Sequence, residues 1–137
     1  MKPYWILLFP LLLWNHSVYA AEAGEILSTC SKDHSHVEMS GCIEQSAAKS
    51  EATLNAAEST LLDRIAKRDE EPTVVAGMKK AYEEGNEAFK NYRDNECQFY
   101  GSMAAGGNGA NDLRMACTAA LNASRADQLR WVADNWK

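Results

Sequence analysis

Apolar residues recur at intervals of three and four positions along most of the chain, which is the spacing of amphipathic helices. The pattern is clearest from Met78 to Tyr100. Its apolar or small positions, extended back by one turn, are Val75, Met78, Tyr82, Gly85, Phe89 and Tyr92. Lysine and glutamate take most of the other positions, so one stripe is expected to face other helices. We therefore predict a helix over residues 72–100 that is central to the fold, with Phe89 and Tyr92 in the core.

A second helical pattern precedes this one and a third follows it. The second begins at Ser35, which with Glu38 three residues later has the form of a capping box, and it ends in a run of charged residues that predicts a turn. The third begins at about Asp112, after a glycine-rich stretch, residues 101–111, that is typical of a loop. No stretch alternates apolar and polar residues for long enough to predict a strand. The predicted fold is all-α, a tight antiparallel helical hairpin plus a third helix, over residues 35–137.

The first 20 residues have a different pattern. A single basic residue, Lys2, precedes an apolar run and then small or branched residues up to Ala20, as in a secretory signal peptide. The apolar run is too interrupted for a transmembrane helix of about 20 residues, so no stable membrane anchor is expected after cleavage. Residues 21–34 show no strong pattern and are predicted to be a loose N-terminal lead-in. Removing the positive charge of Lys2 changes the formal net charge from -5 to -6.

Four cysteines follow the predicted cleavage site: Cys30, Cys42, Cys97 and Cys117. An even number of cysteines in a small exported domain predicts two disulfides, and the spacings do not resemble a zinc module. If the hairpin turns near Glu71, Cys42 and Cys97 fall at the same end of the antiparallel pair. Cys30 and Cys117 belong to segments that start or end there, so we expect all four to converge. The residues themselves leave the three pairings open.

Several side chains near this end are candidates for a structural role or for partner contact. Arg93 and Asp94 are adjacent on a helix, so they are not expected to face each other. We favour a structural role in which Arg93 ties the glycine-rich loop or the first helix to the cysteine end, and partner contact is the alternative. The loop residues Gly106, Gly107 and Asn108 are interpreted as a linker, again with partner contact as the alternative. Two tryptophans are expected to anchor the third helix, or to bind a partner if exposed: Trp131 and Trp136.

Metal, catalytic and nucleic-acid chemistry receive little support. His34 and His36 are two residues apart and do not share a helix face, whereas a closed metal site needs about four ligands, so no metal or other cofactor is predicted. No nucleophile and histidine arrangement suggests catalysis, and the acidic balance argues against nucleic acid. An enzyme would need a carboxylate with a perturbed pKa among five candidates. These are Glu38, Glu44, Glu51, Asp94 and Glu96.

Taken in order along the chain, these features resemble a known family. They are Cys30, Glu38-Met39-x-x-Cys42, Leu54-Asn55, Phe89-x-x-Tyr92-Arg93-Asp94-x-x-Cys97, the Gly106-Gly107 loop, Cys117 and Arg125-x-x-x-Leu129. The arrangement resembles the LprI-type lysozyme-inhibitor family over nearly all of the chain after residue 20. It departs from the family pattern at Phe89, where tryptophan is usual, and at Glu58, where tyrosine is usual.

The resemblance implies a small helical protein, periplasmic or secreted, that acts by binding and not by catalysis. Some members inhibit lysozyme, so the implied partner is a basic lysozyme or another cell-wall hydrolase, which an acidic protein would attract. The alternative is a non-inhibitory periplasmic binding or envelope-stress module on the same scaffold. The candidates for partner contact are Arg93, Asp94, Gly106, Gly107 and Asn108.

Overall fold

The computed structural model describes residues 18–136, which form four helices and no strand. The helices are α1 (Val18–Ser31), α2 (His36–Ala66), α3 (Pro72–Ser102) and α4 (Ala110–Asn135). The all-α class, the antiparallel hairpin (α2 and α3) and the third predicted helix (α4) are confirmed. Residues 1–17, most of the predicted signal peptide, lie outside the described residues. No helix within residues 18–136 combines the length and apolarity needed to cross a membrane.

Helix α1 corrects the prediction of a loose lead-in over residues 21–34. Ala23 and Cys30 are buried, and Ile26 and Leu27 pack beside them against α2 and α4. The sequence pattern of α1 is weak because the helix is short and its buried residues Ala23 and Cys30 are small and carry little periodic signal. A helix of 14 residues has marginal stability alone in water, so contact with the two other helices stabilises it.

The starts of α2 and α3 follow from local chemistry. The Ser35 side chain accepts a hydrogen bond from the Glu38 amide, and the Glu38 carboxylate accepts one from the Ser35 amide at 2.8 Å, which confirms the predicted capping box. The Ser35 hydroxyl also donates a hydrogen bond to the Glu38 carboxylate at 2.7 Å, and this bond, together with the one from the Ser35 amide, lowers the pKa of Glu38 below its usual value. Pro72 occupies the first turn of α3, where its missing N–H removes no intrahelical hydrogen bond.

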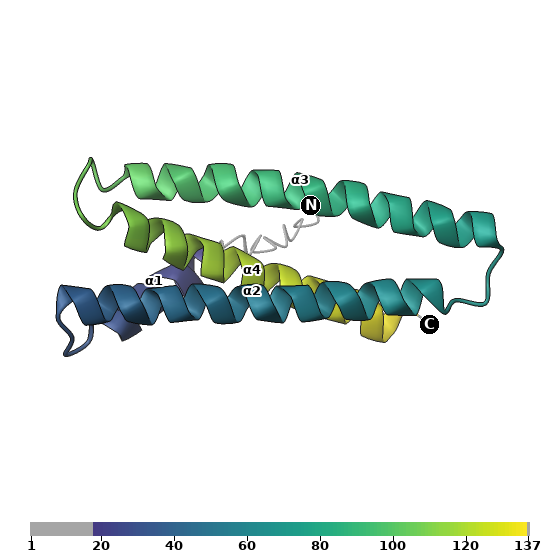
Figure 1. The fold of residues 1–137 in the computed structure, drawn as a ribbon, viewed down its shortest axis with the longest axis horizontal. Helices are drawn as coiled ribbons and strands as arrows, with labels where there is room; N and C mark the ends of the chain where they lie inside the picture. Colours follow the sequence, from purple (N-terminus) through teal and green to yellow (C-terminus); the bar gives the residue numbers. More distant parts are fainter. Residues whose placement is uncertain (1–17, 137) are drawn as a thin grey trace, which may run out of the picture.

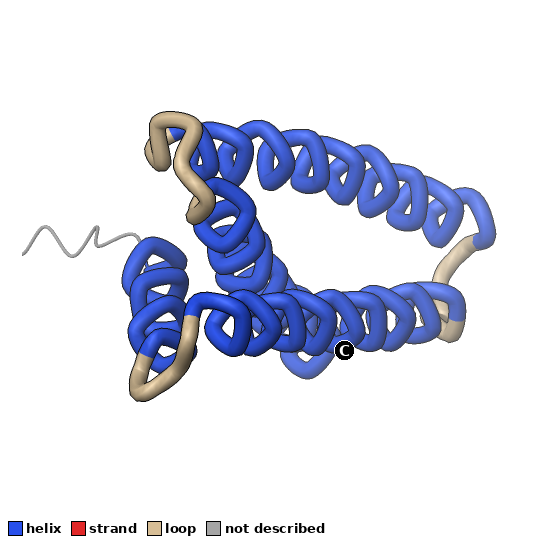
Figure 2. Tube along the Cα trace, turned by 60° about the vertical axis from the view of Figure 1, so that its left-hand side comes forward, coloured by secondary structure: helices blue, strands red, loops and turns tan. Residues whose placement is uncertain are grey.

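Helix α4 is the one around which the other three pack. It contacts α1, α2 and α3, whereas α2 and α3 touch each other only sparsely. In Figure 1, α2 and α3 run in opposite directions, and α4 starts between them at the left and then crosses behind α2; in Figure 2 the traces of α2 and α3 are well separated. The hairpin is therefore antiparallel but not tight, and the prediction that the helix over residues 72–100 is central is wrong.

Burial follows this arrangement. Ten residues of α4 are buried, against three of α3, although α3 is the longer helix. Half of the buried α4 residues are alanines, whose small side chains let three neighbours approach one helix closely. The core joins α2 to α4 over most of their length, with Ile43, Leu54 and Leu61 on α2 facing alanines and Leu129 on α4.

The two disulfides lie at one end of the bundle. Cys30–Cys42 joins α1 to α2, and Cys97–Cys117 joins α3 to α4. Ala116, next to Cys117 in the chain, packs in the same cluster as Cys30, and the α1–α2 and α3–α4 loops are both at the left end of the bundle in Figure 1. The predicted convergence of the cysteines is confirmed, and the structure supplies the pairing that the sequence left open.

Candidate functional site

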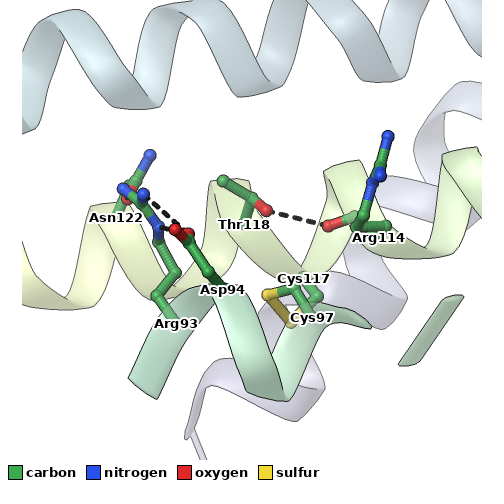
Figure 3. Close-up of a disulfide and its surroundings, with 7 residues drawn as sticks. All are labelled: Arg93, Asp94, Cys97, Arg114, Cys117, Thr118 and Asn122. Atoms are coloured by element: carbon green, nitrogen blue, oxygen red, sulfur yellow. Dashed lines mark hydrogen bonds and ion pairs between the residues drawn. A yellow bond between two sulfur atoms is a disulfide. The ribbon is translucent and has the colours of Figure 1, made fainter. Parts of the chain in front are cut away.

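Arg93 has a structural position that links α3 to α4. Its guanidinium Nη1 donates a hydrogen bond to Asn122 Oδ1 on α4 at 3.1 Å, and only 17% of its side chain is exposed. Asn122 is 1% exposed, and its amide nitrogen lies 3.4 Å from the Ser50 hydroxyl of α2. Arg93 and Asn122 point toward each other in Figure 3. A polar chain therefore joins three helices one turn of α3 before the Cys97–Cys117 disulfide. Of the two predicted ties, the one to the helix that begins at residue 36 is made indirectly through Asn122 and Ser50, and the one to the glycine-rich loop is not seen.

Asp94 lies differently from the sequence prediction. The Arg93 Nε and Nη2 atoms bind the same Asp94 oxygen at 2.9 and 2.8 Å, although the two residues are adjacent. The expectation that they would not face each other is wrong because the long arginine side chain bends back along the helix surface. The Asp94 side chain remains 67% exposed. An exposed pair of this kind contributes about 1 kcal/mol or less, so Asn122 is the partner that fixes Arg93.

Phe89, predicted to lie in the core, is partly buried against it and lies close to two guanidinium groups. The centre of its ring is 6.0 Å from the Arg93 guanidinium and 5.4 Å from that of Arg125 on α4. The ring also packs against both the α2–α4 cluster and the cluster around Cys97 and Cys117. Cation–π contacts of this geometry are favourable by roughly 0.5–2 kcal/mol, so Phe89 helps to hold the middle of α3 on α4.

A polar group of side chains that sequence reasoning missed lies one to two turns before Phe89 along α3. Burial raises the pKa of the Tyr82 hydroxyl to about 12, and the nearby carboxylate of Glu58 on α2 adds to this effect. Among the described residues, the Tyr82 hydroxyl, the Asn86 carbonyl oxygen and the Arg125 Nε have no hydrogen-bond partner although they are buried. The N-terminal half of α3 therefore meets the bundle through polar side chains, and not through a continuous apolar core.

The loop with Gly106, Gly107 and Asn108 is a series of tight turns at the disulfide end. Amide to carbonyl hydrogen bonds connect successive residues through it, for example from Gly107 to Ala104 at 2.8 Å. Ala105 and Gly106 have positive φ angles of 49° and 81°. All three predicted loop residues are exposed. The loop therefore has a defined backbone conformation, held by these hydrogen bonds, and its residues 106–108 are exposed to solvent.

The five predicted partner residues do not form one site. Arg93 lies ten residues before Met103, where the loop begins, which corresponds to about 15 Å along a helix. Arg93 faces α4, Asp94 faces solvent, and the loop residues lie beyond the end of α3. What the structure does bring close to the loop is the disulfide and Gly101. A Cβ at Gly101 would lie 3.1 Å from the Ala110 carbonyl oxygen, so this glycine allows α3 and α4 to approach where they are stapled.

The outer side of this stapled part of α3 carries exposed apolar side chains. Tyr92, Phe99 and Met103 are 45%, 56% and 66% exposed. The prediction that Tyr92 lies in the core is therefore wrong, because α4 covers only one side of α3 and Tyr92 lies beyond its edge. Trp131 and Trp136 are 61% and 68% exposed, so they do not anchor α4.

One sequence signal could have revealed this exposed surface. Residues 97–111 contain no charged side chain, and this is the longest uncharged stretch of the described chain. A solvent-facing helix end and loop in a protein with 24% charged residues would ordinarily carry several charges. Large apolar residues within an uncharged exposed segment are typical of interfaces.

The histidine and carboxylate candidates have local structural roles or are exposed to solvent. The His36 Nε2 atom lies 3.5 Å from the buried Asp112 carboxylate, which also accepts a hydrogen bond from Ser40, so these side chains join the starts of α2 and α4. No set of three or more potential metal ligands gathers anywhere in residues 18–136. Of the five carboxylates that an enzyme would need, Glu96 is half-buried and the other four are exposed, which gives those four no desolvated environment for acid catalysis.

Comparison with known proteins agrees with the resemblance seen in the residues. A family model described as lysozyme inhibitor LprI matches residues 28–129, a range that contains all four cysteines, Arg93 and the α3–α4 loop. No curated protein and no solved structure matches the chain. Because the family match covers most of the 137 residues, the chain belongs to the LprI lysozyme-inhibitor family.

Proposed function

We propose that this protein is an exported inhibitor of lysozyme that acts by binding. The observation that carries the proposal is the family match over residues 28–129. Two disulfides in a small domain support an oxidising location such as the periplasm or the exterior of the cell.

Charge supports this choice of partner. The chain has a formal net charge of -5, and loss of residues 1–20 would leave -6 because Lys2 is removed. Lysozymes of animal hosts are basic, so the two proteins attract each other before contact. Attraction of this kind raises the association rate and orients the encounter more than it raises affinity.

Inhibition by binding requires a rigid surface that blocks access to the lysozyme cleft, where two carboxylates act on the polysaccharide. The disulfide end provides such a surface because Cys97–Cys117, Asn122 and Arg93 fix α3 on α4. In this proposal Arg93 positions the surface and the loop residues Gly106 to Asn108 contact the partner, while Asp94, which lies on another side of α3 from this end surface, is a separate candidate contact.

Lysis of a peptidoglycan suspension tests the proposal. Chicken-type, goose-type and invertebrate-type lysozymes are each assayed with and without the oxidised protein lacking residues 1–20, at low and moderate salt. We expect stoichiometric inhibition of at least one type that weakens as salt increases. An unrelated acidic protein of similar size and charge is the control for non-specific attraction. Absence of inhibition of all three by folded, fully oxidised protein would reject the proposed function.

A further inference from the structure

The exposed apolar surface of α3 forms one continuous face with a single charge in it. Tyr92, Glu96, Phe99 and Met103 follow one another at intervals of four, three and four residues, so their side chains lie along one side of the helix. We propose that these four residues, here called the docking face, bind the basic partner, with Glu96 receiving a lysine or arginine of that protein. This inference rests on the proposed function and locates the surface that performs it.

The composition of the docking face matches the centre of a protein interface. Tyrosine, phenylalanine and methionine are enriched in interface cores, where charged residues are depleted. Phe99 and Met103 are more than half exposed, and the chain from Cys97 to the start of α4 adds no further charge around them. Burying two such side chains provides the kind of anchor that dominates binding energy in many complexes.

Glu96 determines which partner fits. Its side chain is half-buried, and no hydrogen bond or ion pair joins it to another described residue. A carboxylate set among apolar side chains without an internal partner is complementary to a cation that arrives with an apolar surface. A second copy of the chain fits less well, because two-fold pairing through this face would bring two Glu96 carboxylates toward each other.

The docking face is also held rigid from behind. Cys97 and Gly101 lie on the opposite side of the same turns, where both are buried against α4. The Cys97–Cys117 disulfide staples this segment, and the Arg93 to Asn122 hydrogen bond fixes the preceding turn. A surface that is already ordered loses little conformational entropy on binding, which favours affinity.

Two other exposed apolar residues lack this setting: Val74 supplies a control, and Trp131 tests the alternative that the exposed tryptophans contact the partner. Trp131 is 61% exposed, but it lies on α4 among Asp127, Arg130 and Asp134, which are all exposed and charged. Val74 is 43% exposed at the far end of α3, about 37 Å along the helix from Phe99 at 1.5 Å per residue.

Binding of the inhibited lysozyme to variants of the oxidised protein tests the inference. Affinity is measured by calorimetry for Phe99→Ala, Met103→Ala, Glu96→Gln and Glu96→Lys, with Val74→Ala as the control and Trp131→Ala as the comparison with the exposed tryptophan surface, and thermal melting verifies folding of each. We expect each alanine variant of the docking face to raise Kd about tenfold or more, in the range of interface anchors. Glu96→Lys should weaken binding more than Glu96→Gln, because it places two cations together. Val74→Ala and Trp131→Ala should bind as the unchanged protein does.

Three results would overturn the inference, and they separate it from the proposed function. If the unchanged protein binds lysozyme and the docking-face variants bind equally well, the face is wrong and the function stands. If the unchanged protein binds none of the lysozymes, the function fails and the docking inference fails with it. If Phe99→Ala instead converts a dimer into a monomer by light scattering and leaves lysozyme affinity unchanged, the occupant is a second copy.

Discussion

Helices α3 and α4 differ in the strength of their sequence patterns and in how much of each helix is buried. Helix α3 has the clearest division into apolar and charged sides, yet only Asn86, Cys97 and Gly101 are buried in its 31 residues. Helix α4 has a weak pattern and ten buried residues in 26. A helix at the surface needs a polar side, which produces strong periodicity, whereas a helix covered by neighbours on several sides does not. The strength of the pattern therefore identifies a peripheral helix, and not the central one.

The same contrast separates structural from functional roles. The stability of the domain depends on α4, whose small residues accept α1, α2 and α3. Because α3 packs through one side only, its outer side is available for contact with another protein. The following predictions test this division, from the largest expected effect to the smallest.

Truncating a core leucine of α4 should have the largest effect. Leu129 is 3% exposed in the α2–α4 cluster, so Leu129→Ala should lower the free energy of unfolding by about 3 kcal/mol through lost burial and a cavity. Val74→Ala on α3, where the side chain is 43% exposed, should change it by less than about 0.5 kcal/mol. Urea titration of both variants measures the difference. Equal losses would mean that the two helices contribute alike.

Enlarging an alanine tests the close approach of helices to α4. Ala126 is fully buried between α2 and α4, so Ala126→Leu should destabilise the protein by about 2 kcal/mol through overpacking. The same substitution at Ala88, which is exposed on α3, should be nearly neutral. The two melting temperatures provide the comparison, and a neutral Ala126→Leu would contradict a tightly packed α4.

Removing the buried amide that holds Arg93 should have an intermediate effect. Asn122→Ala leaves the Arg93 Nη1 and the Ser50 hydroxyl without this partner, at an expected cost of about 1.5 kcal/mol. Asp94→Asn removes only the exposed half of the Arg93 contacts and should cost less than about 0.5 kcal/mol. Hydrogen exchange of the α3 amides should increase near Arg93 in the first variant. A larger effect for Asp94→Asn would show that the surface pair, and not Asn122, fixes the arginine.

The smallest effect concerns the contact of α1 with α4 and depends on pH. Burial raises the pKa of Glu22 above 4.5, and the charges of Asp127 on α4 and Glu25 add to the shift. A carboxyl with a raised pKa binds its proton more tightly in the folded state, so stability falls as pH rises from about 4.5 through the raised value. Glu22→Gln should therefore stabilise the protein at pH 7 by a few tenths of a kcal/mol, and this gain should disappear below about pH 4. Urea titrations at several pH values measure it, and a gain that persists at low pH would exclude a charge effect.

At the candidate site, the sequence predicted some of the important residues but not their partners or their exposure. The cysteine motif singles out Arg93, but it does not reveal the hydrogen-bond partner Asn122, because a single buried amide has no pattern. Tyr92 follows the apolar stripe of α3 and was assigned to the core, although it lies just outside the area that α4 covers. Periodicity does not single out Phe99 and Met103, because it shows which residues share a side of the helix and not which side another helix covers.

The sequence by itself determined the all-α class, the boundaries of three helices, the set of four cysteines and the family, because capping, periodicity and motif spacing are encoded over short stretches of chain. The tertiary structure decided which helix is central, that residues 18–31 form a helix, which cysteines pair, and which side of α3 faces solvent. Each of these depends on contacts between residues far apart in the chain. Burial depends on how many neighbours a helix has, and no local pattern records that number.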